Sequence, residues 1–196
     1  MKTWKQGEKE VAEHLGNWWA TRFFRSPASG AMATMLGEES IAPSIRKKFT
    51  GDIYCEDDAF PFCVEVKCYD EVPLYPLLTS DEGVLWKFWE QAKRQGVRYG
   101  QIPLLVFKED RRSFFVGFPV YFYELACESI LDAGRPVYTP QIYYPESTNS
   151  FWRMAIRRAD LVVMELSKFT NALNKELVVE LAKAAKKLNL VESKPD

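Results

Sequence analysis

Phe62-Cys63-Val64-Glu65-Val66-Lys67-Cys68 is an apolar run that carries two opposite charges. Apolar and β-branched residues in a short run of this kind favour a β-strand. Alternate side chains of a strand share a face, so Glu65 and Lys67 point to one side and Val66 to the other. Charges inside an apolar strand are costly unless they have partners, and we therefore expect this pair to have a role.

A second carboxylate precedes the strand at Asp52, in the pair Gly51-Asp52, thirteen residues before Glu65. Mg²⁺ prefers hard oxygen ligands and keeps several waters, so two carboxylates can hold it against a phosphate. A divalent cation acidifies water for attack on phosphorus, and Lys67 could orient that water or stabilise the transition state. The pattern indicates metal-assisted phosphodiester hydrolysis, although Glu65 and Lys67 alone also fit an ordinary ion pair.

Helical and strand patterns alternate around these residues. Apolar residues recur at helical spacing at Val11, Leu15 and Trp18, and a short apolar segment follows them. Short apolar strands between helices favour an α/β fold, with a central mixed sheet flanked by helices. We expect a first helix that ends near residue 19, strands at 21–24, 102–108 and 114–118, and a helix at 81–97 capped by Ser80.

In this order of elements the chain resembles the PD-(D/E)xK nuclease superfamily, and within it the archaeal and phage-type Holliday junction resolvases. The resemblance covers residues 5–118 and rests on the segments Arg25-Ser26-Pro27-Ala28-Ser29-Gly30, Gly51-Asp52 and Glu65-Val66-Lys67. It implies a restriction-endonuclease-like fold. It also implies an endonuclease that hydrolyses branched DNA with Mg²⁺, for which Mn²⁺ can substitute.

The resemblance also implies roles for individual residues. Asp52 and Glu65 match the metal ligands, and Lys67 matches the catalytic lysine. Ser29 matches a loop that approaches the scissile phosphate, and Arg25 matches an arginine near the same site.

A glutamate on the first helix is the further carboxylate that the resemblance places at the metal. Glu8 precedes Val11 and Leu15 by three and seven positions, which puts it at the end of the buried stripe. Glu10 would take this place after one register shift, so both glutamates stay candidates, with Glu8 favoured.

Two further segments could contact DNA. Residues 31–50 form an insertion relative to compact resolvases and end in Arg46-Lys47-Lys48, which can neutralise phosphates or form a solvated loop. On the helix at 81–97, Gln91 and Lys93 could point toward the site. Aromatic residues on both sides of this helix favour core packing on one side and a homodimer contact on the other.

Composition limits the remaining options. The net charge is -1 over 196 residues, so a DNA-binding surface must be local. Four cysteines lack a Cys-x-x-Cys pair, which predicts reduced thiols and no iron-sulfur cluster. The single histidine, His14, cannot build a histidine-rich zinc site. Without an apolar run of membrane-spanning length or a signal-peptide pattern, we expect a cytoplasmic protein.

The resemblance ends near residue 120, which predicts a nuclease core at 1–120 and a mainly helical C-terminal extension at 121–196 that packs on it. Helices are expected at 121–131 and 175–188, and a strand at 160–165. Two alternatives stay open for function. One is a nuclease of the same fold that acts on flaps, single strands or duplex DNA, and the other is a non-catalytic DNA-binding or scaffold protein.

Overall fold

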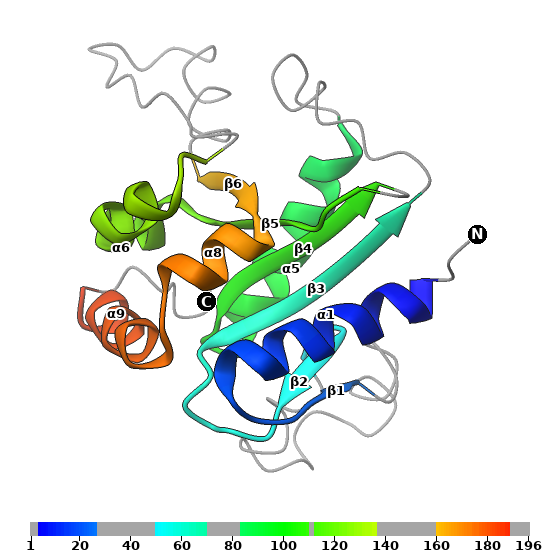
Figure 1. Ribbon diagram of the computed structural model, residues 1–196, viewed down its shortest axis with the longest axis horizontal. Coiled ribbons are helices and arrows are strands. Elements are labelled where there is room, and N and C mark those ends of the chain that lie inside the picture. Colours follow the sequence, from blue (N-terminus) through cyan, green and yellow to red (C-terminus); the bar gives the residue numbers. More distant parts are fainter. Residues whose placement is uncertain (1–3, 27–49, 70–82, 110–111, 137–159, 189–196) are drawn as a thin grey trace.

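A six-stranded sheet runs through the computed structural model, which describes residues 4–26, 50–69, 83–109, 112–136 and 160–188. The strands lie in chain order, β1-β2-β3-β4-β5-β6. β3 and β4 pair in parallel, whereas the other neighbours pair antiparallel. Helices cover both faces of the sheet, as Figure 1 shows. The predicted α/β fold with a central mixed sheet is confirmed.

The strands and helices have the following bounds. The strands are β1 (Phe23–Arg25), β2 (Ile53–Cys55), β3 (Phe62–Tyr69), β4 (Ile102–Glu109), β5 (Phe115–Pro119) and β6 (Leu161–Glu165). The helices are α1 (Trp4–Trp19), α5 (Val84–Arg98), α6 (Val120–Ala133), α8 (Leu166–Ala172) and α9 (Lys175–Lys187).

Side chains of β3 and β4 point alternately to the two faces of the sheet, and each face carries its own hydrophobic cluster. Phe62, Val64 and Val66 of β3 belong to the larger cluster, with apolar residues of α1, α6, α8 and α9. Leu105 and Phe107 of β4 belong to a smaller cluster with α5 and β6. Figure 1 accordingly shows α1 and α8 in front of the sheet and α5 behind it. We call these the crowded face and the α5 face.

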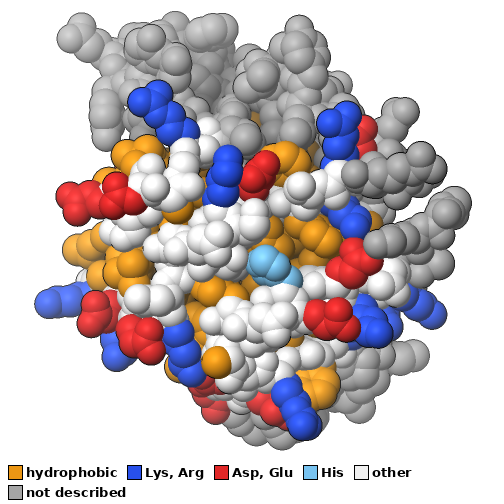
Figure 2. Space-filling model, viewed as in Figure 1, with side chains coloured by type: hydrophobic (Ala, Val, Ile, Leu, Met, Phe, Trp, Pro, Cys, Tyr) orange, Lys and Arg blue, Asp and Glu red, His pale blue; other side chains and the backbone are white. Residues whose placement is uncertain are grey.

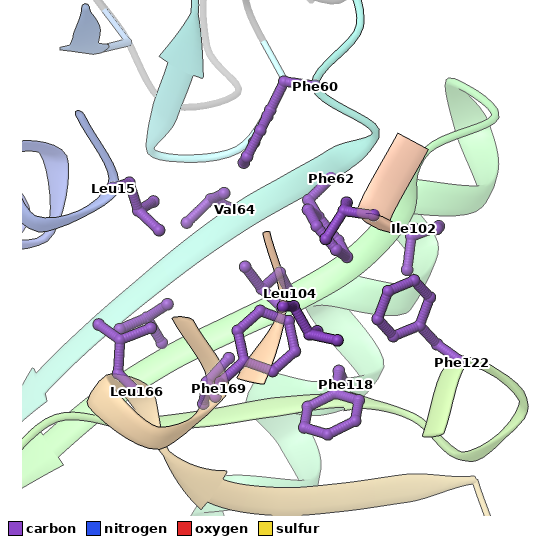
Figure 3. Close-up of a cluster of buried hydrophobic side chains, with 14 of the residues drawn as sticks. Leu15, Phe60, Phe62, Val64, Ile102, Leu104, Phe118, Phe122, Leu166 and Phe169 are labelled. Atoms are coloured by element: carbon purple, nitrogen blue, oxygen red, sulfur yellow. The ribbon is translucent and has the colours of Figure 1, made fainter. Parts of the chain in front are cut away.

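Aromatic rings fill the crowded face. The Phe169 ring of α8 lies 5.0 Å from that of Phe118 and 6.1 Å from that of Phe62, measured between centroids. Phe122 of α6 closes the same group, at 5.4 Å from Phe62. Figure 3 shows these rings together with Leu104 between β3, β4 and the covering helices. Edge-to-face packing of this kind adds to the stability that burial gives.

α1 and α8 also share a polar contact on the crowded face. Nε2 of His14 lies 3.0 Å from Oγ1 of Thr170, within hydrogen-bonding distance. Burial lowers the pKa of His14, which favours the neutral imidazole. In Figure 2 the histidine lies at the surface among hydrophobic side chains. This histidine therefore contributes to helix packing.

Some predicted boundaries were wrong. The helix predicted at 81–97 begins at Val84 with Gly83 as its N-cap, because the extended backbone of Gly83 precedes the first turn, and Ser80 lies outside the described residues. The first strand begins at Phe23, two residues later than predicted. Such shifts are common at the ends of elements.

The region after residue 120 contributes both helices and a strand. β6 pairs antiparallel with β5 and so forms an edge of the central sheet. α6 and α8 pack on the crowded face through Phe122 and Phe169. The predicted domain division at residue 120 stays a prediction, but β6 ties this region to the core. None of the described helices is both long and apolar enough to span a membrane.

Candidate active site

Gly51 brings the chain against β3 just before Asp52. Its φ is +74°, and an added Cβ would collide with the carbonyl oxygen of Val64. The amide of Gly51 donates to Oε1 of Gln95 on α5, at 3.0 Å. A residue with a side chain would be strained here and would push the loop away from β3, so glycine is required for this approach.

Asp52 is fixed to β3 through both its backbone and its carboxylate. Its amide donates to the carbonyl oxygen of Val64 at 2.8 Å. The amide of Val66, which lies between Glu65 and Lys67 in the chain, donates to Oδ2 of Asp52 at 2.8 Å. These bonds hold the Asp52 carboxylate beside the charged pair of β3.

Lys67 lies between the two carboxylates. Its Nζ is 3.0 Å from Oε2 of Glu65 and 3.8 Å from Oδ2 of Asp52. Glu65 is only 1% exposed and Asp52 is 8% exposed, so these charges meet in a poorly hydrated place. This burial differs from that of an ion pair at the protein surface.

Charge is unbalanced at this cluster, with two carboxylates against one ammonium group. Burial and the neighbouring charge of Asp52 raise the pKa of Glu65 to about 7, although Lys67 acts in the opposite direction. A divalent cation would supply the missing positive charge, and carboxylate oxygens are ligands that Mg²⁺ and Mn²⁺ accept. The donor set of Asp52 and Glu65 therefore fits such an ion.

α5 supplies a third wall of the site. Nε2 of Gln91 donates to Oε2 of Glu65 at 3.1 Å, and Nζ of Lys67 lies 5.7 Å from the centroid of the Phe88 ring. Gln91 was among the predicted residues, whereas Phe88 and Gln95 were not. All three fall on one stripe of α5, because they are three, four and seven positions apart. This helical spacing relative to Gln91 could have identified Phe88 and Gln95 from the sequence.

The two candidate glutamates of α1 have different partners. Glu8 accepts a hydrogen bond from Nε of Arg25 on β1 and is 7% exposed. Glu10 accepts from Nζ of Lys108 on β4 at 2.9 Å. Glu8 is thus bonded to Arg25, which was also predicted to lie at the site. Arg25 is followed by Ser26, whose amide donates to the carbonyl oxygen of Asp52.

A third metal ligand is not visible in the described part of the chain. Within residues 4–26, 50–69, 83–109, 112–136 and 160–188, no group of three or more His, Cys, Asp or Glu side chains is arranged to hold a metal ion. Asp52 and Glu65 meet as a pair, and the proposed contribution of Glu8 to the metal shell stays a prediction.

Lys93 lies in another cluster. Its Nζ is 2.5 Å from Oδ2 of Asp160, the residue before β6, and 2.8 Å from Oε1 of Glu90. Trp89 donates to the same Asp160 carboxylate at 3.0 Å. Lys93 therefore ties α5 to the β6 side of the sheet, whereas Gln91 faces Glu65.

The two tryptophans of α5 are covered within the chain, whereas Phe88 is half-buried. Trp86 is 6% exposed and Trp89 is fully buried, because both pack against the α5 face of the sheet. The homodimer stays a prediction.

Four predicted site residues lie outside the described residues: Ser29, Arg46, Lys47 and Lys48. The four cysteines are free thiols, and burial raises the pKa of Cys63 and Cys68. A thiol with a raised pKa stays protonated and is a weak nucleophile, so we assign no catalytic role to either cysteine.

Comparison with known proteins agrees with this geometry. The family model described as "Phage putative PDDEXK endonuclease" matches residues 5–180. Protein D14 of Escherichia phage T5 is 30% identical over 116 residues, which are 57% of this chain and 66% of that protein. The alignment thus spans just under two thirds of this relative.

Among solved structures, this chain is similar to Hjc of Archaeoglobus fulgidus, a Holliday junction resolvase. The match covers 90% of this chain and 96% of the resolvase, at 17% sequence identity and a TM-score of 0.31. At these values the likeness carries no argument about activity or substrate.

Proposed function

Since this chain belongs to the phage PDDEXK endonuclease family, we propose that it is a divalent-metal-dependent DNA endonuclease that hydrolyses phosphodiester bonds in branched DNA. The observation that carries the proposal is the convergence of Asp52 and Glu65 on Nζ of Lys67, at 3.8 and 3.0 Å. An ordinary structural ion pair needs one carboxylate. A second, buried carboxylate beside it is destabilising unless a cation is bound.

In the proposed reaction the oxygen of a water molecule forms a bond to phosphorus. The bond between phosphorus and the leaving sugar oxygen breaks with its electron pair, and that oxygen takes up a proton. Asp52 and Glu65 would hold Mg²⁺ or Mn²⁺, which supplies Lewis acidity toward the phosphate oxygens and lowers the pKa of water.

Lys67 orients the attacking water and stabilises negative charge on the phosphate. Its contacts with both carboxylates fix the ammonium group before substrate binds, so no reorganisation is needed when charge develops. Gln91 keeps Glu65 in place through its 3.1 Å hydrogen bond. Glu8 and Arg25 support the same site from α1 and β1, with Arg25 contacting the scissile phosphate.

Branched DNA as substrate rests on the order of motifs shared with Holliday junction resolvases. A homodimer would then cut two strands symmetrically, as two-fold enzymes do. Ser29 and the basic residues Arg46, Lys47 and Lys48 are proposed to contact DNA phosphates near the site.

The test is cleavage of labelled four-way junction, flap, single-stranded and linear duplex DNA by the full chain in Mg²⁺. Lys67→Ala and addition of EDTA should each abolish the products. Lys9→Ala is the matched control, because Lys9 is exposed on α1 and pairs with the exposed Glu13, at 3.8 Å. Paired symmetric nicks on the junction support the whole proposal.

Other outcomes would overturn parts of the proposal. Cleavage of flaps, single strands or duplex alone would keep the nuclease and reject branched DNA. Cleavage that persists in EDTA would reject the metal. Binding without cleavage in Mg²⁺ or Mn²⁺ would favour the non-catalytic DNA-binding protein.

A further inference from the structure

α5 is the most basic of the described helices that border the site, with four basic residues and one acidic residue among its fifteen. Three of the basic side chains are exposed: Lys87, Arg94 and Arg98. They are seven and four positions apart, so on an α-helix they fall within about 40° of arc. They form one straight stripe along the helix, which we call the α5 stripe.

The three sides of α5 have different neighbours. Leu85, Trp89 and Gly96 pack toward the sheet, where Trp89 belongs to the buried α5-face cluster. Gln91 and Gln95 face the active site, through Glu65 and the amide of Gly51. At about 100° per residue, the α5 stripe lies directly beside Gln91, on its solvent side. The stripe therefore borders the active site along the length of the helix.

The other two charges of α5 are engaged in ion pairs outside the stripe. Lys93 is bound to Asp160 at 2.5 Å, and Glu90 is bound to Lys93 at 2.8 Å. Both lie on the flank of the helix that faces β6, away from Glu65. Glu90 is half exposed and borders the stripe on the side opposite Gln91, but its carboxylate is paired with Lys93, and the three residues of the stripe are all positively charged.

We propose that the α5 stripe binds the phosphate backbone of DNA and holds the strand that leads away from the scissile bond. The identity of the ligand rests on the proposed nuclease function. From Lys87 to Arg98 the stripe spans eleven residues, or about 16 Å, which matches the axial rise of about five nucleotides. Gln91 links the stripe to Glu65, so one DNA strand can contact both.

Charge complementarity favours DNA as the occupant. The chain carries a net charge of -1, so a polyanion cannot be attracted by the molecule as a whole and must bind a local cationic surface. Arginine can contact phosphate through two parallel hydrogen bonds, and Arg94 and Arg98 provide two such groups. Backbone contacts of this kind position DNA without reading its sequence.

The test is DNA binding by the full chain carrying Asp52→Asn, which keeps DNA intact, with and without Lys87→Gln, Arg94→Gln and Arg98→Gln. Kd is measured by fluorescence anisotropy from 50 to 200 mM salt. The stripe variant should bind at least about tenfold more weakly at 100 mM salt. On duplex DNA the magnitude of the negative slope of log K against log salt should decrease by about 2 to 3, because each lost phosphate contact contributes about 0.9.

A matched control removes three exposed cations elsewhere. Lys183→Gln, Lys186→Gln and Lys187→Gln change the net charge equally, and these lysines are exposed on α9. This variant should retain the parent slope and bind within about twofold of the parent. An equal loss in both variants would overturn the proposal, because net charge alone would explain it. An unchanged slope in the stripe variant would also overturn it.

Duplex, four-way junction and single-stranded probes decide which DNA carries the contacted strand. A larger loss on duplex arms than on single strands places the stripe on a duplex arm, and the reverse places it on a displaced strand. Cleavage in Mg²⁺ by the chain with Asp52 intact separates this proposal from the nuclease function. If the chain with Asp52 intact does not cleave DNA but the stripe variant shows the weaker salt dependence of binding, the nuclease function alone is rejected. If that chain cleaves DNA but the stripe variant shows an unchanged salt dependence, DNA binding by the stripe alone is rejected.

Discussion

The two faces of the sheet differ in what covers them. The crowded face lies under α1, α6, α8 and α9 and is filled by interlocking aromatic rings. The α5 face carries a smaller cluster and one covering helix. Glu65 and Lys67 project toward this second face, where Gln91 and Phe88 of α5 meet them. Aromatic packing is therefore concentrated on one face, and the predicted catalytic charges Glu65 and Lys67 lie on the other.

This division follows from the alternation of one strand. Val64 and Val66 of β3 enter the crowded face, and the residues between and beside them enter the α5 face. On the crowded face, Glu10 of α1 is the partner of Lys108 of β4. On the α5 face, polar side chains of α5 and the neighbouring Asp52 contact Glu65 and Lys67. Substitutions on the two faces should consequently affect different properties.

The largest effect is expected from Asp52→Asn on cleavage. The substitution removes one of the two carboxylates that fit a metal while keeping the size of the side chain. We expect the single-turnover rate of cleavage to fall at least about 1,000-fold, at the upper end of losses from one electrostatic group. The free energy of unfolding should change little or increase, because the repulsion between Asp52 and Glu65 is relieved. A rate within tenfold of the parent would contradict this assignment.

On the crowded face, Phe169→Ala is expected to lower stability and leave cleavage unchanged. Phe169 is fully buried and contacts rings of α1, β3, β5 and α6. Its loss should lower the free energy of unfolding by about 3–4 kcal/mol in urea denaturation. Cleavage per folded molecule should be unchanged. Leu188→Ala, at a side chain that is 59% exposed, is the control and should be nearly neutral.

Alanine substitutions at two glycines distinguish the cost of backbone strain from the effect of displacing Asp52. Gly51 and Gly100 both have positive φ, at +74° and +62°, but only an added Cβ at Gly51 would meet β3. Gly100→Ala should cost about 1 kcal/mol from strain alone, with cleavage retained. Gly51→Ala should cost about 3 kcal/mol and lower kcat, because Asp52 moves with it. Equal effects in both would show that the approach to β3 is unimportant.

A smaller effect is expected from pH on the metal-free protein. The pKa of Glu65 is raised from 4.5 to about 7, so the folded state holds a proton that the unfolded chain has released. Stability should therefore fall as pH rises from about 4.5 to 7 and level off above it. The expected loss is at most about 3 kcal/mol in urea denaturation with EDTA, because one pKa unit corresponds to about 1.4 kcal/mol. Glu65→Gln should remove this contribution, whereas Glu13→Gln, at an exposed glutamate, should retain it.

Much of this division was predictable from the sequence, because it depends on local patterns. The alternation of Glu65, Val66 and Lys67 was enough to assign two faces, and the mixed α/β sheet followed from the order of elements. The partners of Glu8 and Lys93 were not predictable. Arg25 and Asp160 lie seventeen and sixty-seven residues from them, and only the completed fold brings these pairs together.

The covering of α5 illustrates a second limit. Trp86 and Trp89 are three positions apart and lie on one side of α5, and the sequence does not tell how much of a helix its own chain will cover. The structure buries both against the sheet and β6, whose pairing with β5 depends on a segment more than forty residues away. The hydrophobic pattern indicated burial correctly, but it could not identify what covers the helix.

The measurement that tests the central claim most directly is calorimetric titration of Mn²⁺ into the full chain and three variants. The account predicts a binding event that is lost in both Asp52→Asn and Glu65→Gln and retained in Glu10→Gln, because Glu10 is bound to Lys108. Binding that survives removal of Asp52 or Glu65, or an absence of binding by the parent chain, would contradict the claim that these two carboxylates form the metal site.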